Sequence, residues 1–156
     1  MVDLDPTDKG ILYLLQQDAR NNTTSGMGEQ IGVSSTTVGN RISNLEENGI
    51  VTGYQPTIDY EKAGLDHHLL LTATAPMDER SQLAEEALGV HGVVTVRELL
   101  THYQNLEIEI ATSTRGEIEE TLNELAELGL ELVRNELLKR ELHQPADNFG
   151  KEVAED

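Results

Sequence analysis

Small side chains that donate and accept hydrogen bonds recur at helical spacing between Ser34 and Ser43. The set consists of Ser34, Ser35, Thr36, Thr37, Gly39, Asn40, Arg41 and Ser43. Hydroxyl and amide groups of this size fit the major groove of DNA, where an asparagine can pair bidentately with adenine. No acidic residue occurs from Gln30 through Leu45, although the chain is strongly acidic. The pattern therefore predicts DNA contacts by these residues.

Individual members of the set have different expected roles. Ser34 is a good N-cap, and the amides of the helix turn after it point to where a phosphate would lie. A glycine inside a helix costs about 1 kcal/mol relative to alanine, so Gly39 is best explained by close approach of the backbone to DNA. Arg41 suits either a DNA phosphate or an internal carboxylate. The alternative for the whole set is an ordinary solvated helix face.

Three helices are expected to position this set. Apolar residues at helical spacing predict a first helix at about 7–19, with Asp5 as its cap. A short second helix at 25–31 and a third from Ser34 to Gly49 follow, with Gly49 as the helix-ending glycine. A glycine-containing turn between the last two predicts a helix-turn-helix at about 23–42. Alternation in residues 50–59 then predicts a hairpin, or wing.

The second half of the chain has a different pattern. Its alternating and helical segments are expected in the order βαββαβ, the order of a ferredoxin-like sheet. The expected strands are 68–75, 93–101, 106–112 and 130–138, and the expected helices are 78–88 and 115–128. Both helices would cover one face of the sheet, so dimerisation through the other face is expected.

The sequence thus predicts an α+β chain: an N-terminal winged helix-turn-helix domain followed by a C-terminal ferredoxin-like βαββαβ (RAM/ACT-like) domain. The expected boundaries are 1–60 for the first domain, 61–66 for a linker and 67–142 for the second domain. Residues 143–156 lack periodicity and are expected to be a mobile acidic tail.

Composition indicates the ionic and cellular environment expected for the protein. The chain has 29 acidic and 11 basic residues, of which only four are lysines, and a net charge of -18. This composition resembles that of halophilic proteins, and at about 1 M salt the Debye length is roughly 3 Å, so distant carboxylates barely act on a DNA phosphate. There is no cysteine, no apolar stretch of membrane-spanning length and no basic leader, so a cytoplasmic location is expected.

Two long motifs resemble the Lrp/AsnC (feast/famine) family of transcription regulators. They are L-D-P-T-D-K-G-I-L-Y-L-L-Q-Q-D-A-R at 4–20 and I-G-V-S-S-T-T-V-G-N-R-I-S-N-L-E-E-N-G-I-V-T-G-Y at 31–54. The element order of the second half and G-V-V-T-V-R-E at 92–98 are also similar to the family's dimerising domain. The resemblance implies a regulator that binds promoter or operator DNA, forms homodimers, assembles further to octamers and responds to an amino acid or another small-molecule effector.

The family's effector turn, roughly T-G-x-x-D, differs here. The resemblance places effector contacts at Thr101, His102, Tyr103 and Asn105. A neutral amide holds an ammonium group less well than a carboxylate, so either the effector is not a free amino acid or this domain only assembles.

Other chemistry has little support in the sequence. The five histidines lack metal-ligand spacing, and Glu107 and Glu109, which share a strand face, have no nucleophile–base partner in the pattern. We therefore expect no enzyme activity, metal or cofactor. One rival remains open, a ligand- or protein-binding assembly module whose helix-turn-helix docks a protein rather than DNA.

Overall fold

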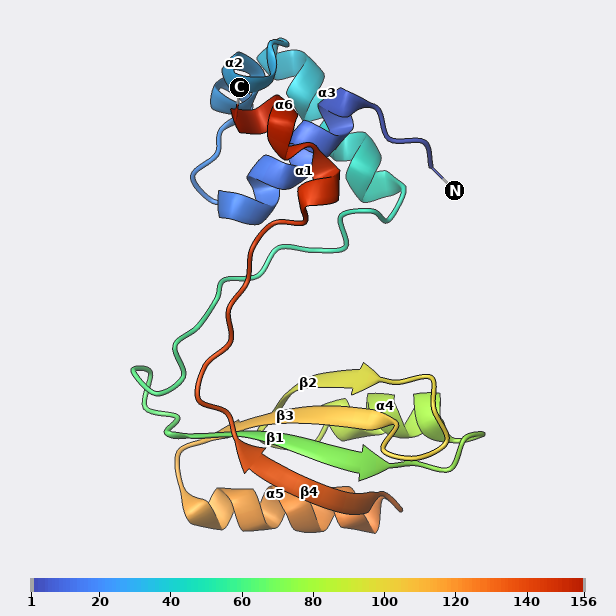
Figure 1. The fold of residues 1–156 in the computed structure, drawn as a ribbon. Helices are drawn as coiled ribbons and strands as arrows, with labels where there is room; N and C mark the ends of the chain where they lie inside the picture. The colour runs from blue at the N-terminus through green and yellow to red at the C-terminus, as the bar shows by residue number, and fades with distance from the viewer. Residues whose placement is uncertain (1, 156) are drawn as a thin grey trace. The chain divides into compact units, whose positions relative to one another are not determined.

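The computed structural model describes residues 2–155, which divide into two compact units. One unit contains the chain up to Pro56 together with the residues from Leu142, and the other is Thr57–Glu141 (Figure 1). Within the described residues, none of the helices combines the length and hydropathy that crossing a membrane requires.

The first unit is built on three helices, as predicted: α1 (Pro6–Asp18), α2 (Thr24–Ile31) and α3 (Ser35–Glu47). Asp5 caps α1 in a capping box with Asp8, and Thr23 caps α2. Gly49 has a φ of 69°, the left-handed conformation expected of a helix-ending glycine. The helices enclose a core of buried residues: Ile11, Leu12, Tyr13, Leu14, Met27, Val38, Leu45 and Ala154.

The predicted hairpin at 50–59 does not form, because the described residues of this segment contain no strand. The backbone N–H groups of Ile50 and Val51 both donate to the Leu45 carbonyl oxygen, and their side chains pack on the core of the helices. The following residues are exposed as far as Asp59. A two-stranded hairpin without a third strand is only marginally stable, so the alternation of residues 50–59 does not by itself produce one.

The second unit has the predicted βαββαβ order: β1 (His67–Thr74), α4 (Arg80–Leu88), β2 (Val93–Glu98), β3 (Leu106–Thr112), α5 (Arg115–Glu127) and β4 (Glu131–Leu137). Its four strands lie in the order β2-β3-β1-β4, and every neighbouring pair is antiparallel. This is the ferredoxin-like arrangement.

Both helices of this unit cover the same face of the sheet. Leu83 and Ala87 of α4 and Leu125 of α5 are buried in one core with alternate residues of β1 and β3, including Leu71 and Ile108. The intervening strand residues lie on the opposite, open face, as expected from the two-residue period of a strand.

The end of the chain differs from the predicted mobile tail. Asp147–Phe149 form a 3-10 helix (η1), and Lys151–Glu155 form helix α6. Both belong to the first unit, where Figure 1 shows α6 beside α1. The sequence lacked a helical period here because each element is too short to show one.

Candidate nucleic-acid interface

Helix α3 begins with a side-chain cap formed inside the predicted DNA-contact set. The Ser34 hydroxyl oxygen accepts a hydrogen bond from the Thr37 backbone N–H at 3.1 Å, and the two hydroxyl oxygens lie 2.8 Å apart. Ser34 is exposed and Thr37 is half-buried. The pair fixes the start of α3 and turns its first amides outward.

The exposed side of α3 is a ridge of small, uncharged residues. We define the polar ridge as Ser35, Thr36, Gly39, Asn40 and Ser43. The four side chains are exposed, whereas Val38 and Leu45 on the opposite side are buried. The ridge is therefore as exposed as a surface that contacts a DNA groove must be, and none of its residues carries a charge.

Gly39 is not explained by packing within the chain. A Cβ atom added there would meet no heavy atom within 4 Å. Gly28 of α2 is the opposite case, because a Cβ there would lie 2.5 Å from the Val33 carbonyl oxygen in the turn before α3. The fold thus requires a glycine at 28 but tolerates a side chain at 39.

Arg41 has the second of its two expected roles, since it contacts internal carboxylates. Its Nη1 atom lies 2.6 Å from Asp5 Oδ2 and 3.1 Å from Asp8 Oδ1. Asp5 and Asp8 form the capping box of α1, so the guanidinium ties α3 to the N-terminus of α1. This geometry supports the internal role of Arg41 over the predicted DNA contact, because charge-assisted bonds already engage the group.

The same contacts change the pKa values of the groups involved. The Asp8 backbone N–H, and next the Arg41 guanidinium, lower the pKa of Asp5 from its ordinary value. Hydrogen bonds from Arg41 to Asp5 and then to Asp8 raise the pKa of the Arg41 side chain. Each shift favours the charged form, so the Asp5 carboxylate and the Arg41 guanidinium both stay ionised at neutral pH.

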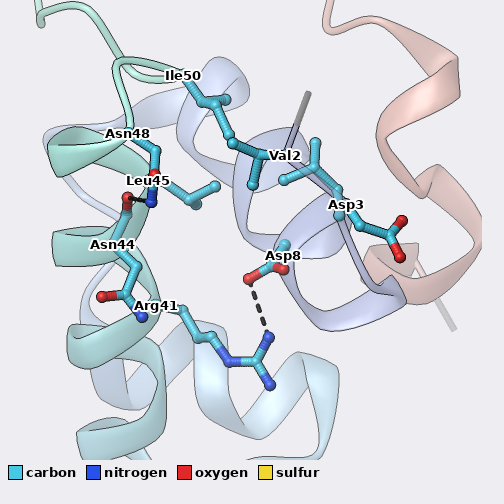
Figure 2. A pocket seen from close by; sticks show the side chains of 9 residues that line it. Val2, Asp3, Asp8, Arg41, Asn44, Leu45, Asn48 and Ile50 are labelled. Carbon is cyan, nitrogen blue, oxygen red and sulfur yellow. Dashed lines mark hydrogen bonds and ion pairs between the residues drawn. The ribbon is translucent and has the colours of Figure 1, made fainter.

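A shallow cavity of about 250 Å³ lies beside this cluster, and Figure 2 shows Arg41 reaching from α3 toward Asp8 along it. Its lining residues are Val2, Asp3, Leu4, Asp8, Arg41, Asn44, Leu45, Asn48 and Ile50. Asn48 Nδ2 donates to the Asn44 carbonyl oxygen at 2.7 Å, and Arg41 and Asp8 neutralise each other. The polar walls are therefore largely paired, and we assign no ligand to this cavity.

Comparison with known proteins identifies relatives of this architecture. Residues 4–52 match the model of the winged helix-turn-helix DNA-binding family. The HTH-type transcriptional regulator LrpA of Pyrococcus horikoshii is 36% identical over 96 residues, which are 62% of this chain and 65% of that protein. The chain thus matches slightly less than two thirds of that relative's length.

Solved structures extend the likeness to nearly the whole chain. The leucine response regulatory protein LrpA of Mycobacterium tuberculosis has a TM-score of 0.74 at 20% identity, with 90% of this chain and 96% of that chain covered. AsnC of E. coli has a TM-score of 0.70 at 19% identity, with 93% and 99% covered. The chain is therefore similar in fold to these two solved regulators. At these identities the structural likeness establishes the shared fold.

The turn in which effector contacts were predicted lies between β2 and β3. Thr101, His102 and Tyr103 are exposed, and Gln104 adopts a left-handed φ of 50°. Asn105 is fully buried: its Oδ1 accepts from the Ala75 N–H at 2.8 Å, and its Nδ2 donates to the Ala75 carbonyl oxygen at 2.9 Å. Asn105 therefore fixes the turn to the end of β1, and we remove it from the predicted effector contacts.

The sequence did not indicate which residues pair in two ionic contacts of this fold. Asp5 was predicted only as a helix cap, and the structure shows that Asp5 and Asp8 both also bind Arg41. On the open sheet face, Glu109 is buried and its Oε1 lies 2.5 Å from His68 Nε2, a pairing that the sequence did not predict. Separations of 33–41 residues in sequence left no local signal for these pairs.

Proposed function

We propose that this protein is a sequence-specific DNA-binding transcription regulator of the Lrp/AsnC type. The supporting observation is the polar ridge, which is exposed, uncharged and borne on the second helix of a helix-turn-helix. Gly39 strengthens the argument, because internal packing does not require a glycine there and a helix that approaches DNA closely does.

Each residue of the α3 surface has a proposed role. Ser35, Thr36 and Ser43 donate to or accept from base edges and phosphates, and Asn40 reads adenine bidentately. Ser34 and Thr37 hold the first-turn amides toward a phosphate. Arg41 positions α3 through Asp5 and Asp8 instead of contacting DNA.

We further propose that the protein is a homodimer formed through the open face of the sheet, with octamers built from dimers. Helices α4 and α5 both pack on the other face of the sheet, so this face is the one left for a partner. The dimer would present two α3 helices about 34 Å apart to a pseudo-palindromic promoter or operator site.

A small-molecule effector is proposed at the β2–β3 turn, through Thr101, His102 and Tyr103. With Asn105 occupied by Ala75, this turn offers neutral hydrogen-bonding groups and aromatic surface, so a free amino acid held by a carboxylate is not the expected ligand. A thermal-shift screen that starts with amino acids tests this proposal.

The acidic composition supports operation in concentrated salt, inside the cytoplasm of a halophile. DNA binding should therefore be measured in high KCl on the DNA upstream of the protein's own gene. If the protein binds neither this DNA nor any sequence selected from a random library, the alternative function is favoured, in which the helix-turn-helix docks a protein.

Substitution of Gly39 by alanine tests the proposed interface directly. A Cβ there meets nothing in the chain and raises helix propensity by about 1 kcal/mol, so Gly39→Ala should be at least as stable as the parent. Its affinity for operator DNA should fall at least tenfold, because the added methyl group lies between α3 and the groove. The matched control is Gly116→Ala on α5, where a Cβ would make only an ordinary 3.9 Å contact with Thr114 Oγ1. Equal operator affinity of both variants would refute the proposed interface.

A further inference from the structure

The segment from Leu142 to the last described residue, which we call the tail segment, packs on the helices of the DNA-binding unit. Phe149 and Val153 are half-buried, and Ala154 is 6% exposed. Ala154 lies in the same core as Ile11 of α1 and Met27 of α2. The tail segment thus completes the core of this unit.

Two glycines shape the contact between the tail segment and α1. Gly10 is buried in the middle of α1, where a Cβ would lie 3.2 Å from Val153 Cγ1 and 3.3 Å from Ile31 Cδ1. Gly150, between η1 and α6, has a φ of 79°, and a Cβ there would lie 3.2 Å from Lys9 Cβ. Glycine is unfavourable inside a helix, so its use at position 10 indicates that close approach of the tail segment is part of the fold.

The contact leads directly to the helix-turn-helix. Ile31, which meets the Gly10 position together with Val153, is the last residue of α2. Helix α2 has eight residues, including Gly26 and Gly28, so its stability depends on tertiary contacts. The turn that starts α3 is hydrogen-bonded to α2, since the N–H groups of Gly32 and Val33 both donate to the Gly28 carbonyl oxygen. Loosening α2 therefore loosens the start of α3.

We propose that the tail segment is an intramolecular latch: its helix α6 occupies a docking site on α1 and α2, and this docking sets the affinity of the helix-turn-helix for DNA. The proposal rests on the proposed DNA-binding function. Because the tail segment follows β4 of the second unit in the chain, changes in that unit can reach α2 through it as well as through residues 57–66. Reciprocity requires that bound DNA stabilise the docked latch by the same factor by which the latch favours DNA.

Hydrogen exchange on the full chain tests this coupling without a substitution. The amides of Val153 and Ala154 donate to the Gly150 carbonyl oxygen in the docked latch. Saturating operator DNA should slow their exchange about fivefold or more, within the usual range of coupling between sites. A segment that only stabilises the fold locally would exchange at the same rate with and without DNA, and that result would overturn the proposal.

A matched pair of variants provides the second test. Ala154→Glu puts a charge into the core contact, and Ala146→Glu makes the same change at an exposed position of the same segment. Ala154→Glu should bind operator DNA about fivefold more weakly or worse, while Ala146→Glu binds as the parent does. If Ala154→Glu does not fold, Val153→Ala replaces it, with a smaller loss in the same direction. Equal affinity of the core and control variants overturns the latch, whereas loss of DNA binding by the parent as well overturns the proposed function first.

Discussion

Replacement of Arg41 by alanine distinguishes a brace inside the protein from a phosphate contact. The guanidinium lies 2.6 Å from Asp5 and 3.1 Å from Asp8, with side-chain exposures of 34% for Arg41, 44% for Asp5 and 13% for Asp8. Screening at this exposure limits the ion pairs to about 1 kcal/mol in total. In a unit of about 70 residues that loss lowers Tm by about 4–8 °C. Differential scanning calorimetry should show the shift in the transition of the DNA-binding unit.

The salt dependence of DNA binding tests the other role, in which Arg41 contacts a phosphate. A phosphate contact contributes about 0.9 to the slope of log affinity against log salt. If Arg41 is a brace, Arg41→Ala lowers operator affinity together with the Tm, and any change in slope comes from the exposed Asp5 and Asp8 carboxylates. The control is Arg20→Ala, which replaces an exposed arginine in the turn after α1 and should keep the parent Tm. A normal Tm together with a slope reduced by about 0.9 in Arg41→Ala would refute the brace.

Three further predictions follow from individual contacts. Asn105→Ala leaves the N–H and carbonyl of Ala75 buried and unpaired, so the free energy of unfolding, measured with denaturant, should fall by about 3 kcal/mol. The control Asn123→Ala, at an exposed helix position, should change that free energy little. Hydrogen bonds from the Ser113 hydroxyl and N–H and from the Thr114 N–H lower the pKa of Glu117 to about 2. The stabilising contribution of Glu117 should therefore be complete above pH 4.5 and be lost as pH falls toward 2. The Tm difference between the parent and Glu117→Gln should shrink over that interval. An unchanged Tm difference at pH 2 would contradict the assigned hydrogen bonds. The affinity of the parent for operator DNA should depend weakly on KCl concentration, or rise with it, because cations bridge carboxylates and phosphates. A steep decrease of affinity with added KCl in a filter-binding or anisotropy titration would exclude such bridging.

The sequence predicted elements whose signals are local and missed those that depend on distant contacts. The three helices have caps and apolar stripes within a few turns of one another, and the strand of residues 106–112 alternates cleanly, so their limits were predicted closely. The hairpin failed because Ile50 and Val51 fold back onto the Leu45 carbonyl. The partners of Arg41 could not be read from the sequence, since its role is decided by carboxylates 33 and 36 residues away.

The same distant contact explains how so acidic a protein can present the proposed DNA-binding surface. Asp5 and Asp8 lie near α3, and if they were unpaired their charges would repel a phosphate at its exposed side. Arg41 offsets one of these two charges and holds both carboxylates in ion pairs, at the cost of its own availability to DNA. The polar ridge then leaves neutral donors to face the duplex. Loss of Arg41 should therefore do more than loosen α3, because it also exposes two carboxylates beside the interface. For that reason Asp5→Asn or Asp8→Asn in the Arg41→Ala background should recover part of the DNA affinity without recovering the lost Tm.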